Sequence, residues 1–203
     1  MVFSMRLKEF YNQMEDLQDI GLSDKGDRHP SHNHFYIDIY DEIISPMKDE
    51  PVQLFEIGIS TGASLVLWSQ YLKNGIITGL DKNIPQRIDY LNTLPNVNII
   101  QGPAYEEYAV NKLCESLPLQ DVLIEDGSHL IEDQIRAIHL YHRLVKPGGY
   151  FIVEDIYLPN LIPFLTQGVY QLKERSFITT IYDYHRRPRG LADDVMVVIK
   201  FFN

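Results

Sequence analysis

Four residues in the second half of the chain have side chains and spacing suited to metal-assisted acid–base chemistry. Asp126 and His129 are three residues apart, and Glu154 and Asp155 are adjacent. Each pair follows a short apolar run typical of a buried strand. Three carboxylates brought to one place repel each other unless a proton or a cation lies between them. A histidine beside such a cation can take up a proton near neutral pH.

The acidic residues predict a metal site. A ligand set of carboxylate oxygens suits a hard cation, Mg²⁺ above all, with Mn²⁺ and Ca²⁺ as alternatives. The competing interpretation is that Asp126 and Ser128 cap the following helix and that Glu154 and Asp155 are loop charges. We favour the metal site because both acidic segments are expected at the ends of neighbouring strands, where ligands bind in parallel α/β sheets.

A second group of candidates lies at residues 54–64, where an apolar run leads into a turn with two glycines. Gly58 and Gly62 occupy positions where a backbone needs unusual dihedral angles or close approach to a ligand. The spacing is neither a dinucleotide fingerprint nor a P-loop. An ordinary tight strand–helix connection is the alternative. We interpret the stretch as a nucleotide-type cofactor loop and assign to it Glu56, Gly58, Ser60, Gly62 and Ser64.

Further cofactor contacts are expected at the next two strand ends. Asp81 lies about twenty residues beyond the glycine turn, where an acidic side chain accepts hydrogen bonds from ribose hydroxyls. Its alternative role is to cap the following helix. Gln101 and Gly102 follow the third strand, and Asp126 faces the same edge, so all three are assigned to the cofactor as well.

These candidates need a scaffold, and residues 51–203 supply one in the form of alternating strands and helices. Apolar runs predict strands at residues 53–57, 76–80, 97–101, 121–125 and 150–153, followed by two strands at 176–184 and 195–202. This order indicates an α/β fold, a Rossmann-like, mostly parallel sheet with helices on both faces and an antiparallel carboxy-terminal hairpin. The first, fourth and fifth strands are expected to be neighbours.

The expected helices cover residues 5–20, 35–45, 63–74, 85–94, 105–117, 130–145 and 159–172. We predict a single domain over residues 1–203, with a helical amino-terminal cap at 1–50 and the Rossmann-like core at 51–203. The polar segment 21–34 between the first two helices reads as an irregular loop. Its histidines, His29, His32 and His34, match no zinc template, so we expect them to be exposed to solvent.

Composition narrows the class of partner. A formal net charge of −10 and a pI near 5.1 argue against nucleic acid or an anionic membrane, because both need a basic surface. The only cysteine, Cys114, has no partner for an intramolecular disulfide. No apolar stretch is long enough to predict a membrane span. We therefore expect a cytoplasmic protein whose partner is a small molecule, with the oligomeric state left open.

The chemistry-bearing segments taken together resemble one family. From about residue 23 to 156 the chain is similar to the metal-dependent sugar O-methyltransferases of natural-product biosynthesis, the macrocin and mycinamicin type, within the class I S-adenosylmethionine-dependent methyltransferases. The resemblance rests on Ser23-Asp24-Lys25-Gly26, Phe55-Glu56-Ile57-Gly58, Gly79-Leu80-Asp81, Asp126-Gly127-Ser128-His129 and the run from Pro147 to Asp155.

This resemblance implies that S-adenosylmethionine and Mg²⁺ are the cofactors. It also implies that Asp126, Glu154 and Asp155 bind the metal and that His129 is the general base, so that His129 and Asp126 form the catalytic pair. The implied reaction is direct displacement of the sulfonium by a metal-bound hydroxyl of a sugar, glycoside or related polyol. An antibiotic hydroxylase-like relative and a non-catalytic cofactor-binding accessory subunit are the alternatives.

The chain departs from the family in a few places. The residues after the third strand, Gln101 to Ala104, contain no acidic side chain for the adenine ring, and fewer residues precede the first strand than in the macrolide enzymes. Substrate-closing elements are therefore expected to be reduced or supplied by a second subunit. Lys25 and His34 either neutralise the cofactor's carboxylate or are solvated loop residues. The basic loop around Arg186 reads as a charged hairpin tip or as a contact for an anionic substrate.

Overall fold

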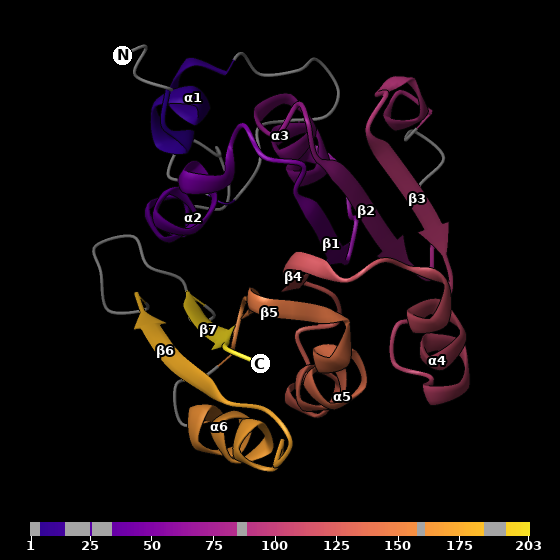
Figure 1. Ribbon diagram of the computed structural model, residues 1–203, viewed down its shortest axis with the longest axis vertical. Helices are drawn as coiled ribbons and strands as arrows, with labels where there is room; N and C mark the ends of the chain where they lie inside the picture. Colours follow the sequence, from indigo (N-terminus) through magenta and orange to yellow (C-terminus); the bar gives the residue numbers. More distant parts are fainter. Residues whose placement is uncertain (1–4, 15–24, 26–33, 85–88, 158–160, 185–193) are drawn as a thin grey trace.

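The computed structural model describes residues 5–14, 25, 34–84, 89–157, 161–184 and 194–203, and the account below concerns these residues. Seven strands form one sheet: β1 (Gln53–Ile57), β2 (Ile76–Asp81), β3 (Val97–Gln101), β4 (Gln120–Glu125), β5 (Val145–Val153), β6 (Phe177–Asp183) and β7 (Val195–Phe201). Their order in the sheet is β3-β2-β1-β4-β5-β7-β6 (Figure 1). The first five strands pair in parallel, and β7 pairs antiparallel with both β5 and β6.

Helices cover both faces of this sheet (Figure 1). They are α1 (Leu7–Gln13), α2 (Ile37–Ile44), α3 (Ala63–Tyr71), α4 (Glu107–Ser116), α5 (Ile131–Tyr141) and α6 (Ile162–Tyr170), with short 3₁₀ turns η1 (Ser45–Met47), η2 (Leu91–Thr93) and η3 (His142–Leu144). The predicted class I methyltransferase fold is confirmed, including the antiparallel carboxy-terminal hairpin and the adjacency of β1, β4 and β5.

The core has two layers, one on each face of the sheet. One layer combines α1, α2 and α3 with strand residues such as Leu54, Ile124 and Ile152. The other combines α4, α5 and α6 with strand residues such as Phe55 and Leu123. Because successive residues of a strand point to opposite faces, burial on both faces requires continuous apolar runs rather than alternating ones. The two amino-terminal helices share a layer with the sheet, and the predicted boundary at residue 50 stays a prediction.

Several predicted boundaries need correction. The helix expected at residues 130–145 ends at Tyr141, and β5 begins at Val145, five residues earlier than predicted, with an irregularity in its pairing with β4. The glycines at 148 and 149 therefore lie inside a distorted strand start rather than in a separate turn. In place of the helix expected at 85–94, the described part of that segment contains only the turn η2. The first helix ends at Gln13, and residues 15–20 of its predicted range lie outside the described residues.

Candidate active site

The site lies at the carboxyl edge of the sheet, where β1, β4 and β5 end side by side. Backbone hydrogen bonds continue the ladder one step beyond the strands: the amide of Asp126 donates to the Ile57 carbonyl over 2.9 Å, and the amide of Glu154 donates to the Glu125 carbonyl over 3.0 Å. These bonds bring the ends of the glycine loop, the Asp-Gly-Ser-His segment and the Glu-Asp pair together. The predicted convergence of the three segments is thus seen in the structure.

The backbone leaves its usual conformations at this edge. Ser60, His129 and Asp155 have φ values of 46°, 56° and 51°, although none is a glycine. Each such residue costs on the order of 1–3 kcal/mol, and such positions cluster at functional sites. Gly58 has φ of 94°, and a Cβ placed there would lie 1.9 Å from the carbonyl oxygen of Asp126. Glycine is therefore required at position 58 by the close approach of the β4 end as well as by its conformation.

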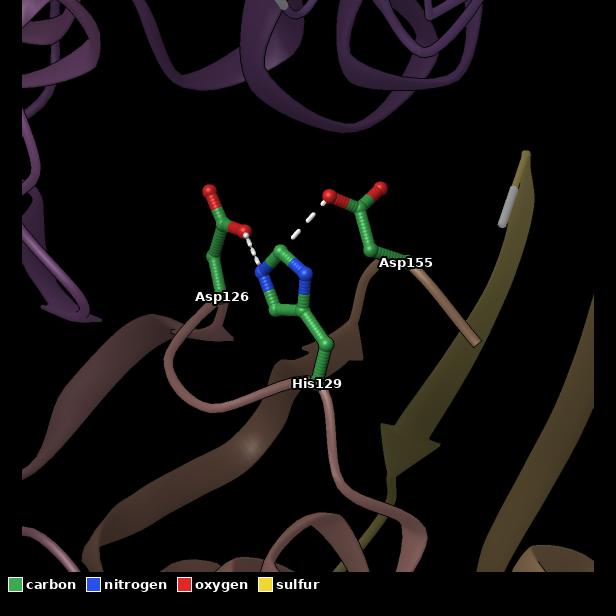
Figure 2. Close-up of side chains that lie close together, drawn as sticks. All are labelled: Asp126, His129 and Asp155. Carbon is green, nitrogen blue, oxygen red and sulfur yellow. Dashed lines mark hydrogen bonds and ion pairs between the residues drawn. The ribbon is translucent and has the colours of Figure 1, made fainter. Parts of the chain in front are cut away.

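The centre of the site is a triangle of Asp126, His129 and Asp155 (Figure 2). The His129 Nε2 atom lies 3.1 Å from Asp126 Oδ1 and 3.7 Å from Asp155 Oδ2. One ligand atom from each of the three side chains lies within 4.8 Å of the others, a separation that a single cation can span. The donor set of two carboxylates and an imidazole suits a divalent metal. The two carboxylates therefore fit the Mg²⁺ that the sequence predicts, whereas the role of His129 as the base stays a prediction.

The charges in this triangle influence one another strongly. The hydrogen bond to Asp126 raises the pKa of His129 to about 9, against the effect of burial. Burial alone would raise the pKa of Asp126, but Lys25 and His129 lower it to about 2. Burial, followed by the Asp126 charge, raises the pKa of Asp155 to about 6. In the absence of a metal, the imidazole is thus held in its charged form by the neighbouring carboxylate.

Glu154, the third predicted ligand, points away from the triangle. Its carboxylate accepts a hydrogen bond from the hydroxyl of Tyr40 and another, over 2.7 Å, from the ammonium of Lys25. Strand alternation explains the direction, because Glu154 follows Ile152 on the face covered by α1, α2 and α3. Its assignment as a metal ligand stays a prediction, and in the structure its partners are a lysine and a tyrosine.

Lys25 is the residue whose position the sequence least indicates. Its Nζ atom lies 2.5 Å from Asp126 Oδ2 and 3.6 Å from Glu56 Oε1, in addition to its bond to Glu154. The side chain is 1% exposed, so the interpretation as a solvated loop residue is wrong. Burial lowers the pKa of Lys25, but attraction by Asp126, Glu154 and Glu56 outweighs this and raises it well above its ordinary value.

The state of Glu154 follows from its partners. Burial raises its pKa, Lys25 opposes this, and the charges of Asp126 and Asp155 add to it. Both of its oxygens nevertheless accept bonds from donors that favour the carboxylate form, the Lys25 ammonium and the Tyr40 hydroxyl. We therefore describe Lys25 and Glu154 as a buried ion pair.

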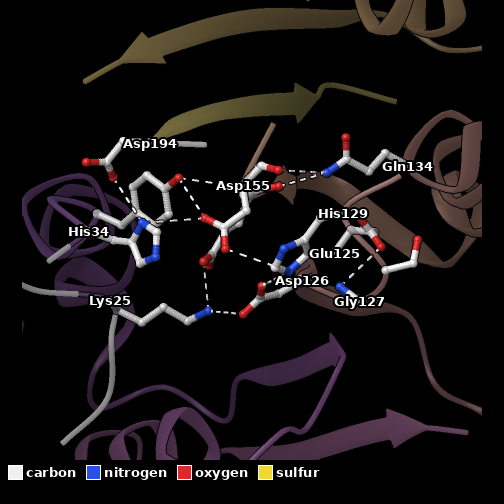
Figure 3. Close-up of polar contacts among 12 residues, drawn as sticks. Lys25, His34, Glu125, Asp126, Gly127, His129, Gln134, Asp155 and Asp194 are labelled. Carbon is white, nitrogen blue, oxygen red and sulfur yellow. Dashed lines mark hydrogen bonds and ion pairs between the residues drawn. The ribbon is translucent and has the colours of Figure 1, made fainter. Parts of the chain in front are cut away.

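A second buried group supports Asp155 from behind. His34 Nδ1 lies 3.0 Å from Asp194 Oδ1 and 3.6 Å from Asp155 Oδ1 (Figure 3). The hydroxyl of Tyr36 donates to the same Asp155 oxygen over 2.9 Å, and its ring stacks on His34. His34 is 3% exposed, so the expectation that it is exposed to solvent is wrong. His29 and His32 lie outside the described residues, as does the basic loop at 185–193.

Beside the metal triangle, the same edge contains a cavity of about 260 Å³. Its lining includes the predicted cofactor residues Gly58 and Asp81, together with Ala104, Gly127 and Ser128. The volume is near the lower end of the usual range for small-molecule sites, roughly 300–1,000 Å³. The cavity lies where an open parallel sheet binds its ligand, beyond the carboxyl ends of the strands.

Asp81 has structural partners inside this cavity. One carboxylate oxygen accepts the amide of Ile59 over 2.9 Å, and the other accepts the amide of Asn83 over 2.9 Å. Asp81 therefore fixes the turn that carries Gly58. Each oxygen retains a second lone pair toward a ribose, so the predicted ribose role is compatible with this geometry.

The other predicted cofactor residues do not line the cavity. Glu56 is fully buried; it accepts the indole N–H of Trp68 over 2.7 Å and is bonded to Ser64. Gly62 is the N-cap residue of α3, and Ser60 lies in the turn before it. The Gln101 side chain donates a hydrogen bond to the carbonyl of Lys82, and the Gly102 amide donates to the carbonyl of Asp81. Asp126 reaches the edge between the cavity and the metal triangle. The cofactor roles of these residues stay predictions.

Two residues at the cavity, Tyr105 in its lining and Glu125 bonded to it, were not singled out by the sequence. The Tyr105 hydroxyl donates to Glu125 Oε1 over 2.6 Å and accepts the amide of Ser128 over 3.0 Å. Glu125 is completely buried, its Oε2 atom has no hydrogen-bond partner, and burial raises its pKa to about 7. This pair supports the loop that carries Gly127. Its only sequence signal is the alternation of β4, which directs residue 125 to the opposite face from residue 124.

Known proteins share both sequence and fold with this chain. No protein-family model matches it. An 8-demethyl-8-alpha-L-rhamnosyl tetracenomycin-C 2'-O-methyltransferase from Streptomyces olivaceus is 26% identical over 168 residues, which are 78% of this chain and 43% of the relative. A demethylmacrocin O-methyltransferase from Streptomyces fradiae is 26% identical over 131 residues, 61% of this chain and 32% of the relative.

The predicted resemblance to sugar O-methyltransferases of the macrocin and mycinamicin type is confirmed. Among solved structures, the MycE methyltransferase from the mycinamycin biosynthetic pathway, in complex with Mg, SAH and mycinamycin VI, superposes with a TM-score of 0.68 at 19% identity. The match covers 87% of this chain and 51% of that one. This likeness concerns the fold, and the chain spans less than half the length of the curated relatives named above. In the described part of the chain, no helix has the length and apolar character of a membrane span.

Proposed function

We propose that this chain is an S-adenosylmethionine- and Mg²⁺-dependent O-methyltransferase that acts on a hydroxyl group of a sugar, glycoside or related polyol. The observation that carries the proposal is the juxtaposition of two sites on one edge of the sheet. The Asp126, His129 and Asp155 triangle suits a divalent cation, and the cavity beside it lies under the Gly58 turn. Both are needed if a hydroxyl is to be activated next to a methyl donor.

The metal would be held by Asp126 and Asp155, with Glu154 as the third predicted ligand. Bound there, Mg²⁺ would lower the pKa of a substrate hydroxyl and fix its orientation. The carboxylates provide the negative charge that such an ion requires, and the Tyr36 hydroxyl bond to Asp155 keeps that carboxylate oriented. The cavity lined by Gly58 and Asp81 would receive the nucleoside part of the cofactor.

His129 would accept the proton of the acceptor hydroxyl. As the oxygen forms its bond to the methyl carbon, the carbon–sulfur bond breaks and its electron pair stays on sulfur, giving the thioether product. An imidazole can act as base only when neutral. The charge of Asp126 raises the pKa of His129, so compensation of that charge lowers the pKa toward its ordinary value and makes the base available.

The choice of acceptor rests on the relatives. Their names specify O-methylation of a rhamnosyl tetracenomycin-C, of mycinamicin VI and of an L-olivosyl-oleandolide. A glycoside with two neighbouring hydroxyls is therefore the acceptor class we propose. The net charge of −10 supports a small neutral acceptor rather than a nucleic acid.

A methyl-transfer assay tests this proposal. The protein is incubated with S-adenosylmethionine, Mg²⁺ and a panel of rhamnosides and other glycosides, and methylated sugar is detected by mass spectrometry. We expect transfer to acceptors with neighbouring hydroxyls, and a loss of about 100-fold or more with EDTA, because metal activation supplies several kcal/mol to the transition state.

A deoxyglycoside that lacks one of the two hydroxyls is the matched control acceptor. Cofactor binding by calorimetry without transfer to any acceptor would instead support a non-catalytic accessory subunit. Transfer that is unaffected by EDTA would contradict the metal role.

A further inference from the structure

The side chain of Lys25 occupies the place of a cation within the acidic cluster. Its ammonium group lies 2.5 Å from Asp126 Oδ2 and 2.7 Å from Glu154 Oε2, with Glu56 Oε1 at 3.6 Å. Figure 3 shows the lysine side chain extending toward Asp126. With 1% of the side chain exposed, this is a buried, multiply paired ammonium rather than a surface ion pair.

Two of these three carboxylates belong to the predicted metal-binding set. Asp126 presents one oxygen to Lys25 and the other to His129, and Glu154 has no oxygen without a protein donor. An ammonium and a divalent cation are therefore directed to the same two carboxylates. Two cations this close repel each other more strongly in a buried site than in water, because the effective dielectric constant is lower.

We propose that Lys25 is a built-in counter-cation that competes with the divalent metal for Asp126 and Glu154. It keeps these carboxylates together when no metal is bound, and it lowers the affinity of the site for the metal. Lys25 is thus a positioning residue that sets metal affinity. This inference rests on the proposed function, since it requires that the cluster binds a metal.

The surroundings of Lys25 separate this role from simple structural support. Glu154 is also held by the Tyr40 hydroxyl, and Glu56 is also held by the indole of Trp68. Asp126 is held by the backbone ladder and by His129. The carboxylates therefore keep their own donors when the lysine charge is removed. If Lys25 only stabilised the fold, its loss would disorder the cluster and weaken metal binding; if it competes, its loss strengthens metal binding.

The experiment compares Mn²⁺ binding to the wild-type protein, Lys25→Met and Lys25→Arg, without cofactor or acceptor, by electron paramagnetic resonance of free Mn²⁺. Methionine keeps an unbranched apolar stem, one atom shorter than lysine, but removes the charge, whereas arginine keeps the charge. We expect Lys25→Met to bind Mn²⁺ at least about tenfold more tightly, and Lys25→Arg to stay within about threefold of wild type.

Lys146→Met is the matched control for net charge. Lys146 pairs with Asp121 over 2.7 Å, is about one-third exposed, and lies at the start of β5, the end opposite to the cluster. Like Lys25→Met, this variant removes one positive charge, but far from the cluster. It should leave the Mn²⁺ affinity unchanged. Thermal unfolding in EDTA and in saturating Mn²⁺ provides a second readout, and the stabilisation by Mn²⁺ should be greater in Lys25→Met than in wild type.

Equal or weaker Mn²⁺ binding by Lys25→Met, with normal binding by wild type, would overturn the competition and leave the metal site intact. An absence of Mn²⁺ binding in wild type would instead overturn the metal site itself, and the competition with it. If Lys25→Met is unfolded in EDTA, Mn²⁺ should restore its circular dichroism spectrum. The Mn²⁺ concentration needed for this should be lower than the concentration that half-saturates the wild-type protein. Failure of Mn²⁺ to restore it would also overturn the proposal.

Discussion

The cofactor cavity and the metal cluster lie on the same edge of the sheet but are constructed differently. The cavity is formed by the segments after β1, β2, β3 and β4, and its one predicted acidic residue, Asp81, is bonded to nearby amides. The metal cluster is formed by buried charges whose partners come from distant segments, including Lys25 and Asp194. The cavity is therefore a local product of strand ends, whereas the cluster depends on how the whole chain assembles.

The most severe test of this difference is Asp126→Asn. Asp126 contacts both Lys25 and His129, so its loss removes the central charge of the cluster. We expect kcat/KM for methyl transfer to fall on the order of 10³-fold, because metal activation is lost. Cofactor affinity, measured by calorimetry, should change by less than about threefold, since the cavity is formed by neighbouring backbone. Activity within tenfold of wild type would contradict the assignment.

His129→Gln addresses the base without removing a carboxylate. We expect kcat to fall about 10²–10³-fold, as is usual for loss of a general base, while Mn²⁺ affinity falls far less. His139→Gln on α5 is the matched control, since His139 is not part of the cluster. Rates are compared over a range of pH. A normal pH–rate profile for His129→Gln would rule out the proposed base.

Asp81→Asn acts on the cofactor side alone. The amide side chain keeps an acceptor for one of the two turn amides, and it loses the charge, the acceptor of the other amide and one acceptor toward a ribose. We expect the dissociation constant for S-adenosylmethionine to rise about tenfold, with Mn²⁺ affinity unchanged. Binding of both ligands is measured by calorimetry. Equal weakening of both would show that the two sites are not separable.

Tyr36→Phe removes two hydrogen bonds to Asp155, because the hydroxyl donates to the carboxylate over 2.9 Å and accepts the Asp155 amide over 3.3 Å. Loss of such an outer partner usually costs 10–100-fold in metal affinity, and we expect a value near the lower end, about tenfold. Tyr71→Phe provides the control, because Tyr71 is buried and donates to a backbone carbonyl away from the cluster. If Tyr36→Phe left the Mn²⁺ affinity unchanged, only the residues that bind the metal directly would determine that affinity.

Glu125→Gln has the smallest expected effect on activity and a distinct effect on stability. Burial raises the pKa of Glu125 to about 7, above the unfolded value of 4.5. A raised carboxyl pKa contributes stability that is present below pH 4.5 and is lost as the pH rises through 7. We expect the ionisation of Glu125 to lower the free energy of unfolding by about 3 kcal/mol between pH 4.5 and pH 7.

The glutamine variant should lack this loss, because its side chain is neutral and can still accept the Tyr105 hydroxyl. Urea unfolding at pH 5 and pH 8 measures the difference. An identical pH dependence in wild type and Glu125→Gln would contradict the account of this buried carboxyl.

The same contrast explains what the sequence could predict. The sheet, the parallel order and the meeting of Gly58, Asp126 and Glu154 follow from apolar runs and from the rule that strand ends share an edge. Successive side chains of a strand point to opposite faces of the sheet, so residue 125 points away from residue 126 and residue 154 away from residue 155. The assignment of Glu154 as a metal ligand did not take this into account.

The partners of the cluster could not be read in this way. Lys25 lies 101 residues before Asp126, and His34 lies 160 residues before Asp194. Both come from or adjoin a polar segment whose composition indicates a loop, and a lone lysine or histidine there carries no signal of burial. Their positions follow from contacts with residues far away in the sequence, which no local pattern determines.

The central claim is that a methyl donor and a divalent metal bind side by side at this edge. Nuclear magnetic resonance of S-adenosylmethionine labelled with ¹³C at the methyl group, bound in the presence of Mn²⁺, tests it directly. We predict strong paramagnetic relaxation of the methyl resonance in the wild-type protein. In Asp126→Asn, with the cofactor still bound, this relaxation effect should be absent. A bound cofactor whose methyl resonance is unaffected by bound Mn²⁺ would contradict it.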